Sequence, residues 1–147
     1  MREPLSKRRL KAWIRMLGTV RATENHLRGF LRDGHATTLP RFDVMAALWR
    51  RREGVTMGDL SRMLLVSGGN ATAIVARLEA DGLCLRTPSD RDRRTVYVTL
   101  TERGVATFER QAREHEHTIS ALFGSISEAD LDALTDILKR LRPKVPA

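Results

Sequence analysis

Apolar side chains recur every three or four positions through the first part of the chain, which is the spacing of one α-helix face. This spacing predicts a long amphipathic helix over residues 6–33, with Ser6 as its N-cap. Pro40 suits the first turn of a second helix, which ends near Arg52 and is apolar on most of its sides. The stripe of the first helix consists of Leu10, Trp13, Ile14, Leu17, Val20, Leu27 and Leu31.

Two short helices are predicted next. Thr56 can cap a helix over residues 57–64. Ser67 can cap the following helix, which ends just before Gly82, a residue suited to a left-handed helix stop. Two helices joined by a tight turn have the dimensions of a helix-turn-helix.

A β-hairpin and two further helices complete the pattern. The runs 83–87 and 95–100 are rich in β-forming residues and predict an antiparallel hairpin. Thr101 can cap a long helix that Gly124 stops, and Ser127 can cap the last helix. The last helix carries an apolar stripe of Leu131, Leu134, Ile137, Leu138 and Leu141.

These elements predict a fold that is mainly α with a small antiparallel β-wing, a winged helix-turn-helix flanked by N- and C-terminal dimerisation helices. We expect an N-terminal dimerisation helix in residues 1–38, the winged helix-turn-helix in 39–101, and C-terminal dimerisation helices in 102–147. So small a central domain cannot cover both outer apolar stripes, and their exposure would be costly. A twofold homodimer is the simplest way to cover them.

The chain is strongly basic, with 26 Lys and Arg against 18 Asp and Glu and a formal net charge of +8. Such a surface attracts polyanions, so nucleic acid and anionic lipid are candidate partners. No stretch has the apolar length of a secretory signal or a membrane span, and we expect a cytoplasmic protein. The single cysteine, Cys84, permits no internal disulfide and no cysteine-based zinc site, and we expect no metal or cofactor.

The predicted fourth helix has two contrasting faces, one apolar and the other small, polar and almost free of acid. Small residues let a backbone approach a grooved partner closely, as the second helix of a helix-turn-helix does in the major groove. The alternative is that residues 67–70 form only a flexible cap. The apolar face holds Ala71, Ile74, Val75 and Leu78, and the outward face holds Gly69, Thr72, Ala73 and Ala76, flanked by Asn70 and Arg77.

The hairpin tip holds five consecutive charges, from Asp90 to Arg94. Its arginines would reach the minor groove beside the predicted fourth helix, which is the expected recognition helix, because negative potential in that groove attracts guanidinium groups. The tip aspartates are expected to pair with these arginines and hold them in one geometry, the alternative being weak surface pairs on an exposed turn. The expected DNA contacts are Thr56, Ser67, Gly68, Gly69, Asn70, Thr72, Ala73, Arg77, Arg91, Arg93 and Arg94.

An ordered set of motifs runs through residues 39–104. RFDV and AAL come first, L-x-V-S-x-G-N-x-T and R-L-E-x-x-G-L frame the fourth helix, and D-R-R followed by V-x-L-T-E-x-G covers the hairpin. This set resembles the MarR family of bacterial winged-helix regulators. The resemblance implies a homodimer on double-stranded DNA, with Arg94 in the minor groove, Asp92 bracing it, and Arg91 and Arg93 on phosphates.

Members of this family commonly release DNA when a small aromatic molecule binds, or when a cysteine in the first helix is oxidised. The chain has no cysteine there, so Cys84 is expected to be a small core residue. The resemblance implies instead a small-molecule effector, an aromatic acid or its coenzyme A thioester. The candidate ligand contacts, for which a core role is the alternative, are Trp13, Met16, Phe42, Met45 and Trp49.

The predicted function is a ligand-responsive transcriptional regulator, with repression favoured, that binds a pseudo-palindromic operator. The motifs of common enzymes, a Gly-rich phosphate loop, G-x-S-x-G and H-E-x-x-H, do not occur in the sequence. His115 and His117 point apart on a helix, so we expect them to face solvent or an interface rather than a metal. The alternative function is a basic interaction or membrane-surface module without sequence-specific DNA binding.

Overall fold

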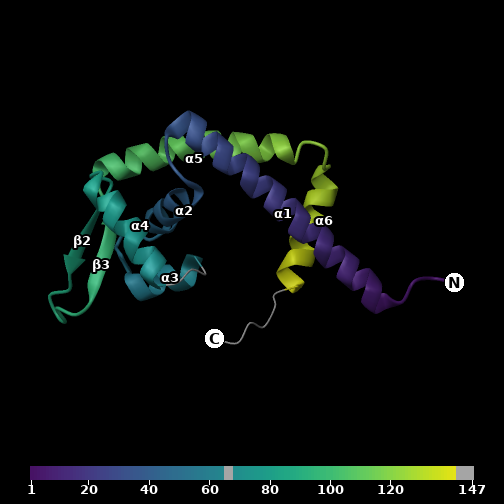
Figure 1. Ribbon diagram of the computed structural model, residues 1–147, viewed down its shortest axis with the longest axis horizontal. Coiled ribbons are helices and arrows are strands. Elements are labelled where there is room, and N and C mark those ends of the chain that lie inside the picture. Colours follow the sequence, from purple (N-terminus) through teal and green to yellow (C-terminus); the bar gives the residue numbers. More distant parts are fainter. Residues whose placement is uncertain (65–67, 142–147) are drawn as a thin grey trace. The chain divides into compact units, whose positions relative to one another are not determined.

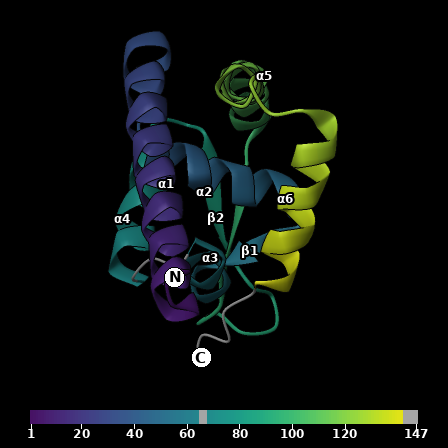
Figure 2. The ribbon, with the colours of Figure 1, turned by 90° about the vertical axis from the view of Figure 1, so that its right-hand side faces the viewer.

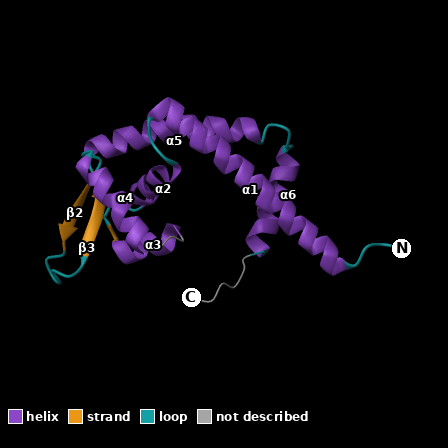
Figure 3. Cartoon of the chain, in the orientation of Figure 1, coloured by secondary structure: helices purple, strands orange, loops and turns teal. Residues whose placement is uncertain are grey.

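The computed structural model describes residues 1–64 and 68–141 of the chain. Most of these residues are helical and three short strands form one sheet, so the predicted fold class is confirmed (Figures 1 and 3). The chain divides into two compact units, one ending at His115 and one beginning at Glu116, and each is described by itself. The elements are α1 (Leu5–His35), α2 (Leu39–Arg50), β1 (Val55–Thr56), α3 (Met57–Leu64), α4 (Gly68–Ala80), β2 (Cys84–Pro88), β3 (Val96–Leu100), α5 (Glu102–Leu122) and α6 (Glu128–Arg140).

The sheet has β3 at its centre, with β1 and β2 paired antiparallel on its two sides; β1 and β2 are labelled in Figure 2. The predicted hairpin is confirmed as the β2–β3 pair, in which Cys84 lies opposite Leu100. The sequence pattern does not predict β1, which is two residues long and places Val55 opposite Val98. Both valines are fully buried, so this third strand closes the core beside the helix-turn-helix.

Helix α2 forms the centre of the first unit and is buried on nearly every side, as its apolar sequence predicts. Val44, Met45 and Leu48 are at most 1% exposed. The neighbouring elements α1, α3, α4 and β3 all contact α2. Burying a side chain of this size contributes about 1.5–3 kcal/mol, so α2 is the element that holds the others in place.

Hydroxyl caps fix the starts of three predicted helices. Each of these three hydroxyl groups accepts a hydrogen bond from a backbone N–H in the first turn of its helix. The bond satisfies one of the donors that a helix start leaves without a partner. Gly82 has φ +75°, the left-handed conformation expected at the end of α4. The predicted cap Ser67 lies outside the described residues. The three bonds run from Asp59 N to Thr56 Oγ1 (3.2 Å), from Gly104 N to Thr101 Oγ1 (3.0 Å) and from Asp130 N to Ser127 Oγ (3.1 Å).

The ends of α1 differ from the prediction. Ser6 is not the N-cap, because Pro4 holds that position with an extended backbone and its carbonyl accepts the Arg8 N–H at 3.1 Å. The helix continues to His35 and stops where Ala36 adopts the left-handed conformation at φ 50°. The Ala36 N–H then bonds back to the Leu31 carbonyl, which closes the last turn.

Two apolar stripes are largely exposed, one in each unit. In α1 only Leu27 and Leu31 are buried, while Leu10, Trp13, Ile14 and Val20 are each more than half exposed. In α6 no residue is buried. Exposed fractions of 45–51% are found for Leu131, Ile137 and Leu138 in α6 and for Leu141, its C-cap.

Helix α5 begins in close contact with the backbone before β2. A Cβ atom on Gly104 would lie 2.0 Å from the carbonyl oxygen of Leu83 and 3.3 Å from Cδ2 of Leu100. The Leu83 carbonyl cannot easily move, because it accepts the Thr101 N–H at 3.1 Å. Only glycine therefore permits this approach between α5 and the base of the wing.

We predict that Gly104→Ala lowers the free energy of unfolding by about 2 kcal/mol or more, since the backbone must shift to admit the methyl group. Gly18→Ala is the matched control, because a Cβ atom at this position in α1 meets no atom within 4 Å. The control should be neutral or should stabilise the protein by about 1 kcal/mol, as alanine does in a helix. Urea unfolding followed by circular dichroism measures both variants. Equal effects would mean that the contact at Gly104 relaxes without cost.

Candidate nucleic-acid interface

Helices α3 and α4 pack against each other and against α2, which gives the helix-turn-helix predicted from the sequence. The predicted apolar face of α4 is confirmed: Ala71, Val75 and Leu78 are fully buried, and Ile74 is half-buried. The predicted outward face is confirmed over the residues whose burial the structure describes. Its exposed members are Asn70, Thr72, Ala73, Ala76 and Arg77.

The outward face of α4 combines small side chains with one arginine. The first acid of the helix, Glu79, lies near its C-terminal end and is engaged by Arg86. Gly68 and Gly69 form the first turn of α4, and the predicted contact Ser67 lies outside the described residues. Thr56 is half-buried, and its hydroxyl accepts the Asp59 N–H, so it is occupied in capping α3.

The wing tip is held by backbone hydrogen bonds. The Ser89 N–H donates to the Thr95 carbonyl at 2.8 Å, and the Thr95 N–H donates to the Asp92 carbonyl at 3.0 Å. Asp92 adds side-chain bonds, because its Oδ1 accepts the Arg94 N–H at 3.0 Å and its Oδ2 accepts the Thr95 hydroxyl at 3.4 Å. A short polar turn thus acquires a defined shape without a hydrophobic core.

The expected ion pairs within the tip are not formed. In the described part of the chain, neither Asp90 nor Asp92 has an oxygen within ion-pair distance of a tip arginine. The carboxylate of Asp92 is occupied by the backbone, so it shapes the turn and leaves the guanidinium groups unpaired. Arg91, Arg93 and Arg94 are all exposed.

The sequence reasoning missed the ion pair that ties the wing to the recognition helix. Glu79, near the end of α4, accepts the Arg86 backbone N–H at 3.0 Å and two guanidinium N–H groups at 3.1 and 2.9 Å. The side-chain hydrogen bonds from Arg86 hold the pKa of Glu79 below its ordinary value. The sequence does contain a signal for this ion pair. Glu79 and Arg86 carry opposite charges on either side of Gly82, and the turn at Gly82 brings α4 and β2 together.

The five predicted ligand contacts do not share one environment. Phe42 and Met45 are buried in the core of the first unit. Trp49 is 39% exposed, lies 5.8 Å from the Phe108 ring between centroids, and donates its Nε1–H to Glu109 at 3.3 Å. Trp13 and Met16 lie on α1, where Trp13 is exposed and Met16 half-buried.

His115 is half-buried within its own unit and does not simply face solvent, and its interface position stays a prediction. Its ring stacks on Phe42 with 4.6 Å between centroids, and burial lowers its pKa. His117 is exposed. Across residues 1–64 and 68–141 no group of three or more His, Cys, Asp and Glu side chains could hold a metal ion.

Cys84 is fully buried, as expected for a core residue. Its thiol donates a hydrogen bond to the Val75 carbonyl at 3.6 Å. Burial raises the pKa of Cys84 to about 11, so the thiol is protonated at neutral pH and is a poor nucleophile.

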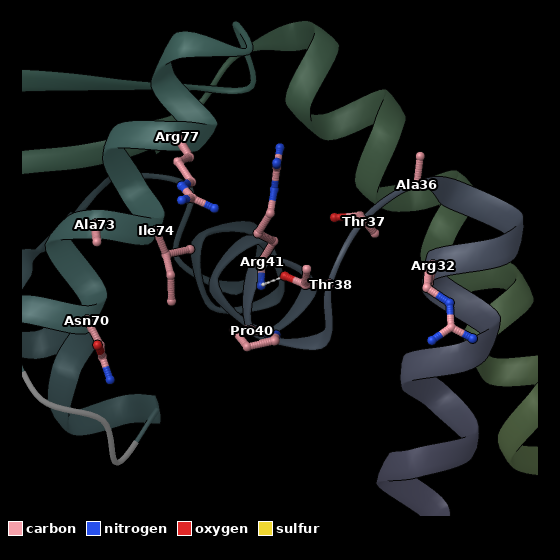
Figure 4. Close-up of a pocket in the computed structure, with 10 residues that line it drawn as sticks. All are labelled: Arg32, Ala36, Thr37, Thr38, Pro40, Arg41, Asn70, Ala73, Ile74 and Arg77. Atoms are coloured by element: carbon pink, nitrogen blue, oxygen red, sulfur yellow. Dashed lines mark hydrogen bonds between the residues drawn. The ribbon is translucent and has the colours of Figure 1, made fainter.

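A pocket of about 890 Å³ lies along the flank of α4 that faces the α1–α2 connection (Figure 4). We call it the recognition-helix pocket. Three arginines contribute to its lining, and none of the five predicted ligand contacts does. Its lining residues are Arg32, Ala36, Thr37, Thr38, Pro40, Arg41, Asn70, Ala73, Ile74 and Arg77.

The helix-turn-helix packs against α2 and exposes a face of small side chains and one arginine. It is followed by a hairpin that carries exposed arginines. Together these features define a winged-helix DNA-binding protein. No helix in the described ranges is long and apolar enough to cross a membrane.

Comparison with known proteins identifies the family: the chain belongs to the MarR family, whose sequence pattern matches residues 37–96. The HTH-type transcriptional regulator MhqR of Bacillus subtilis is 23% identical over 137 residues, which cover 93% of each chain. The HTH-type regulator YkoM of the same species is 31% identical over 106 residues, or 72% of this chain and 68% of the relative. The chain is thus similar to transcriptional regulators and not to enzymes.

The fold is also that of a solved regulator bound to DNA. A mutant of MarR from Escherichia coli, complexed with operator DNA, matches with a TM-score of 0.80. The two chains are 22% identical, and the match covers 96% of this chain and 100% of that one. At this identity the likeness establishes the fold, and the residue-level contacts with DNA must be argued from the chain itself.

Proposed function

We propose that this regulator binds a pseudo-palindromic operator as a homodimer, with α4 in the major groove and the wing in the minor groove. The observation that carries this proposal is the exposed, small and acid-poor face of α4 beside a wing whose tip arginines, Arg91, Arg93 and Arg94, form no ion pair with a described residue. Both features favour close approach to a polyanion. Repression is the favoured outcome, because a dimer lying across an operator would exclude other proteins from the same DNA.

The major-groove contacts are proposed for the start and the outward face of α4 and for Thr56, which caps α3. The helix N-terminus offers backbone N–H groups to phosphate, and its small residues allow the backbone to approach the base edges. Arg77, further along the exposed face, can bond guanine or phosphate. The proposed set is Thr56, Ser67, Gly68, Gly69, Asn70, Thr72, Ala73 and Arg77, of which Ser67 lies outside the described residues.

The minor-groove contact is proposed for Arg94. Asp92 supports it through the Arg94 backbone N–H, which fixes where the side chain starts while the guanidinium stays unpaired. A narrow minor groove has a strong negative potential that attracts such a group. Arg91 and Arg93 would then contact the neighbouring phosphates.

The dimer is proposed to form through residues 1–38 and 102–147, with 39–101 as the DNA-binding domain. The exposed apolar side chains of α1 and α6 support this division, because each would be removed from water in a partner contact. Two recognition helices related by a twofold axis match half-sites about 10 base pairs apart.

The effector is proposed to be an aromatic acid or its coenzyme A thioester. The recognition-helix pocket supports this chemistry, because Arg32 and Arg77 contribute guanidinium groups that can bind a carboxylate, and Ile74 and Pro40 contribute apolar surface. Arg77 and Ala73 also belong to the proposed DNA face, so a ligand there would compete with the operator. The alternative location is the aromatic set of Trp13, Met16, Phe42, Met45 and Trp49.

We predict that Arg94→Ala weakens operator binding by about 1–3 kcal/mol, because a groove-inserted arginine is lost. Arg8→Ala removes the same charge from the exposed start of α1 and should change binding little. Wild-type affinity should also fall by roughly 10³-fold between about 50 and 200 mM salt. Fluorescence anisotropy with a labelled duplex measures all three values. Equal losses for the two variants, or tighter binding to anionic vesicles than to duplex, would favour the basic surface module instead.

We predict that Leu138→Glu converts the dimer to a monomer and weakens operator binding by at least about tenfold, because a buried carboxylate opposes association. Lys139→Gln is the matched control, since it changes the net charge by the same amount on the adjacent residue, outside the apolar stripe. Light scattering gives the oligomeric state, and anisotropy gives the affinity. A monomeric wild-type protein that binds one half-site as tightly as the full operator would rule out the dimer.

We predict that an aromatic acid lowers operator affinity with a coupling of about 1–3 kcal/mol. Arg32→Gln should weaken this effect and leave DNA affinity unchanged without the ligand, because Arg32 lines the pocket but does not lie on α4. Trp49→Phe is the comparison for the alternative location. Binding is followed by tryptophan fluorescence with DNA competition. A ligand that binds without changing DNA affinity would refute the switch.

A further inference from the structure

A second cavity, of about 450 Å³, lies between the α1–α2 connection and α5, and we call it the α5 cavity. Arg103, Arg110 and Gln111 contribute to it from α5, and Asp81 contributes from the end of α4. Arg41 lines both cavities, and Figure 4 shows its side chain extending away from Pro40. The outward face of α4 takes no part in the α5 cavity.

Two residues that line this cavity each carry a buried polar atom without a hydrogen-bond partner. The two atoms are Oε1 of Gln111, whose residue is only 4% exposed, and Nε of Arg41. Within the described ranges these are the only such side-chain atoms. A buried polar group without a partner costs about 1–3 kcal/mol, so the coincidence of an acceptor and a donor on one cavity requires an explanation.

The charges of the cavity favour an anion. Arg41 forms an ion pair with Asp81, and Arg103 Nη1 donates to the Asp81 carbonyl at 3.2 Å. Arg110 forms no ion pair with any described residue. Another lining residue, His35, is engaged by Glu114 at 2.7 Å. Three arginines against one aspartate leave an excess of two positive charges.

We propose that the α5 cavity binds a small dianion that carries a hydroxyl group. The anionic groups match the two excess charges and the guanidinium donors of Arg103, Arg110 and Arg41 Nε, which suit planar carboxylates and phosphates. The hydroxyl donates to Gln111 Oε1, the one buried acceptor that a simple anion would leave unsatisfied. A hydroxy-dicarboxylate and a sugar phosphate share this chemistry.

The test is isothermal titration of the full-length protein, without DNA, at constant ionic strength. Malate and succinate form one matched pair. Glycerol 3-phosphate and methyl phosphate form the other, at a pH at which both phosphate groups are dianions. Only the first member of each pair has a hydroxyl. The hydroxylated member of at least one pair should bind about tenfold more tightly, the gain expected of one buried hydrogen bond. The pair that responds identifies the source of the anion. Absence of binding by all four compounds at about 10 mM, the weak end of metabolite affinities, would overturn the proposal.

Three variants separate the cavity from general charge effects. Gln111→Met keeps the side-chain volume and removes the acceptor, so the preference for the hydroxylated member should disappear while binding of the plain anion is retained. Its melting temperature without ligand should be unchanged or higher, because a buried group without a partner is removed. Arg110→Gln should weaken both members of the responding pair about tenfold, whereas Arg113→Gln, on the same helix but outside the cavity, should not.

Two outcomes would overturn the assignment even if an anion binds. If Gln111→Met still preferred the hydroxylated compound, Gln111 would not be the acceptor of the ligand's hydroxyl group. Equal losses in Arg110→Gln and Arg113→Gln would show that the anion responds to net charge alone. Because Arg110 is exposed, Arg110→Gln should fold normally. A loss of binding in this variant can therefore be assigned to the cavity and not to misfolding.

Discussion

The burial of α2 is the constraint on which the DNA-binding part of the chain depends. A helix with Val44, Met45 and Leu48 almost completely inaccessible must be enclosed from several directions at once. The recognition helix, the central strand of the sheet and the end of α1 provide that enclosure. Their mutual positions are therefore fixed by the packing of one short apolar helix rather than by polar contacts on the surface.

Polar contacts instead determine the local structure of the exposed wing. Glu79 engages Arg86 at the base of the wing, and the Asp92 carboxylate is occupied by backbone and hydroxyl donors of the turn. Both acids are thus satisfied without neutralising the arginines at the tip. Arg91, Arg93 and Arg94 therefore form no ion pair with either of these two acids.

Local signals in the sequence account for what could be predicted. Thr56, Thr101 and Gly82 act within a few residues of their own position, so these two caps and this helix stop followed from the sequence, as did the two faces of α4. The strand β1 escaped prediction because Val55 depends on pairing with the distant Val98. The recognition-helix pocket and the α5 cavity escaped it for the same reason, since residues far apart in sequence line each of them. For Asp92 the sequence predicted an ion pair with a tip arginine, whereas its carboxylate accepts the backbone N–H of Arg94 and the hydroxyl of Thr95.

The connection between α1 and α2 is three residues long, and hydrogen bonds engage all three of its residues. Ala36 and Thr37 donate to the Leu31 carbonyl, and Thr38 caps α2 through the Arg41 N–H. Such a joint transmits torque, because it has little freedom to absorb rotation by bending. A tilt of α1 would therefore be passed to α2 and, through the packing of α2 against α4, to α4. Under the proposed function, the orientation of α1 would then affect the angle at which α4 meets DNA.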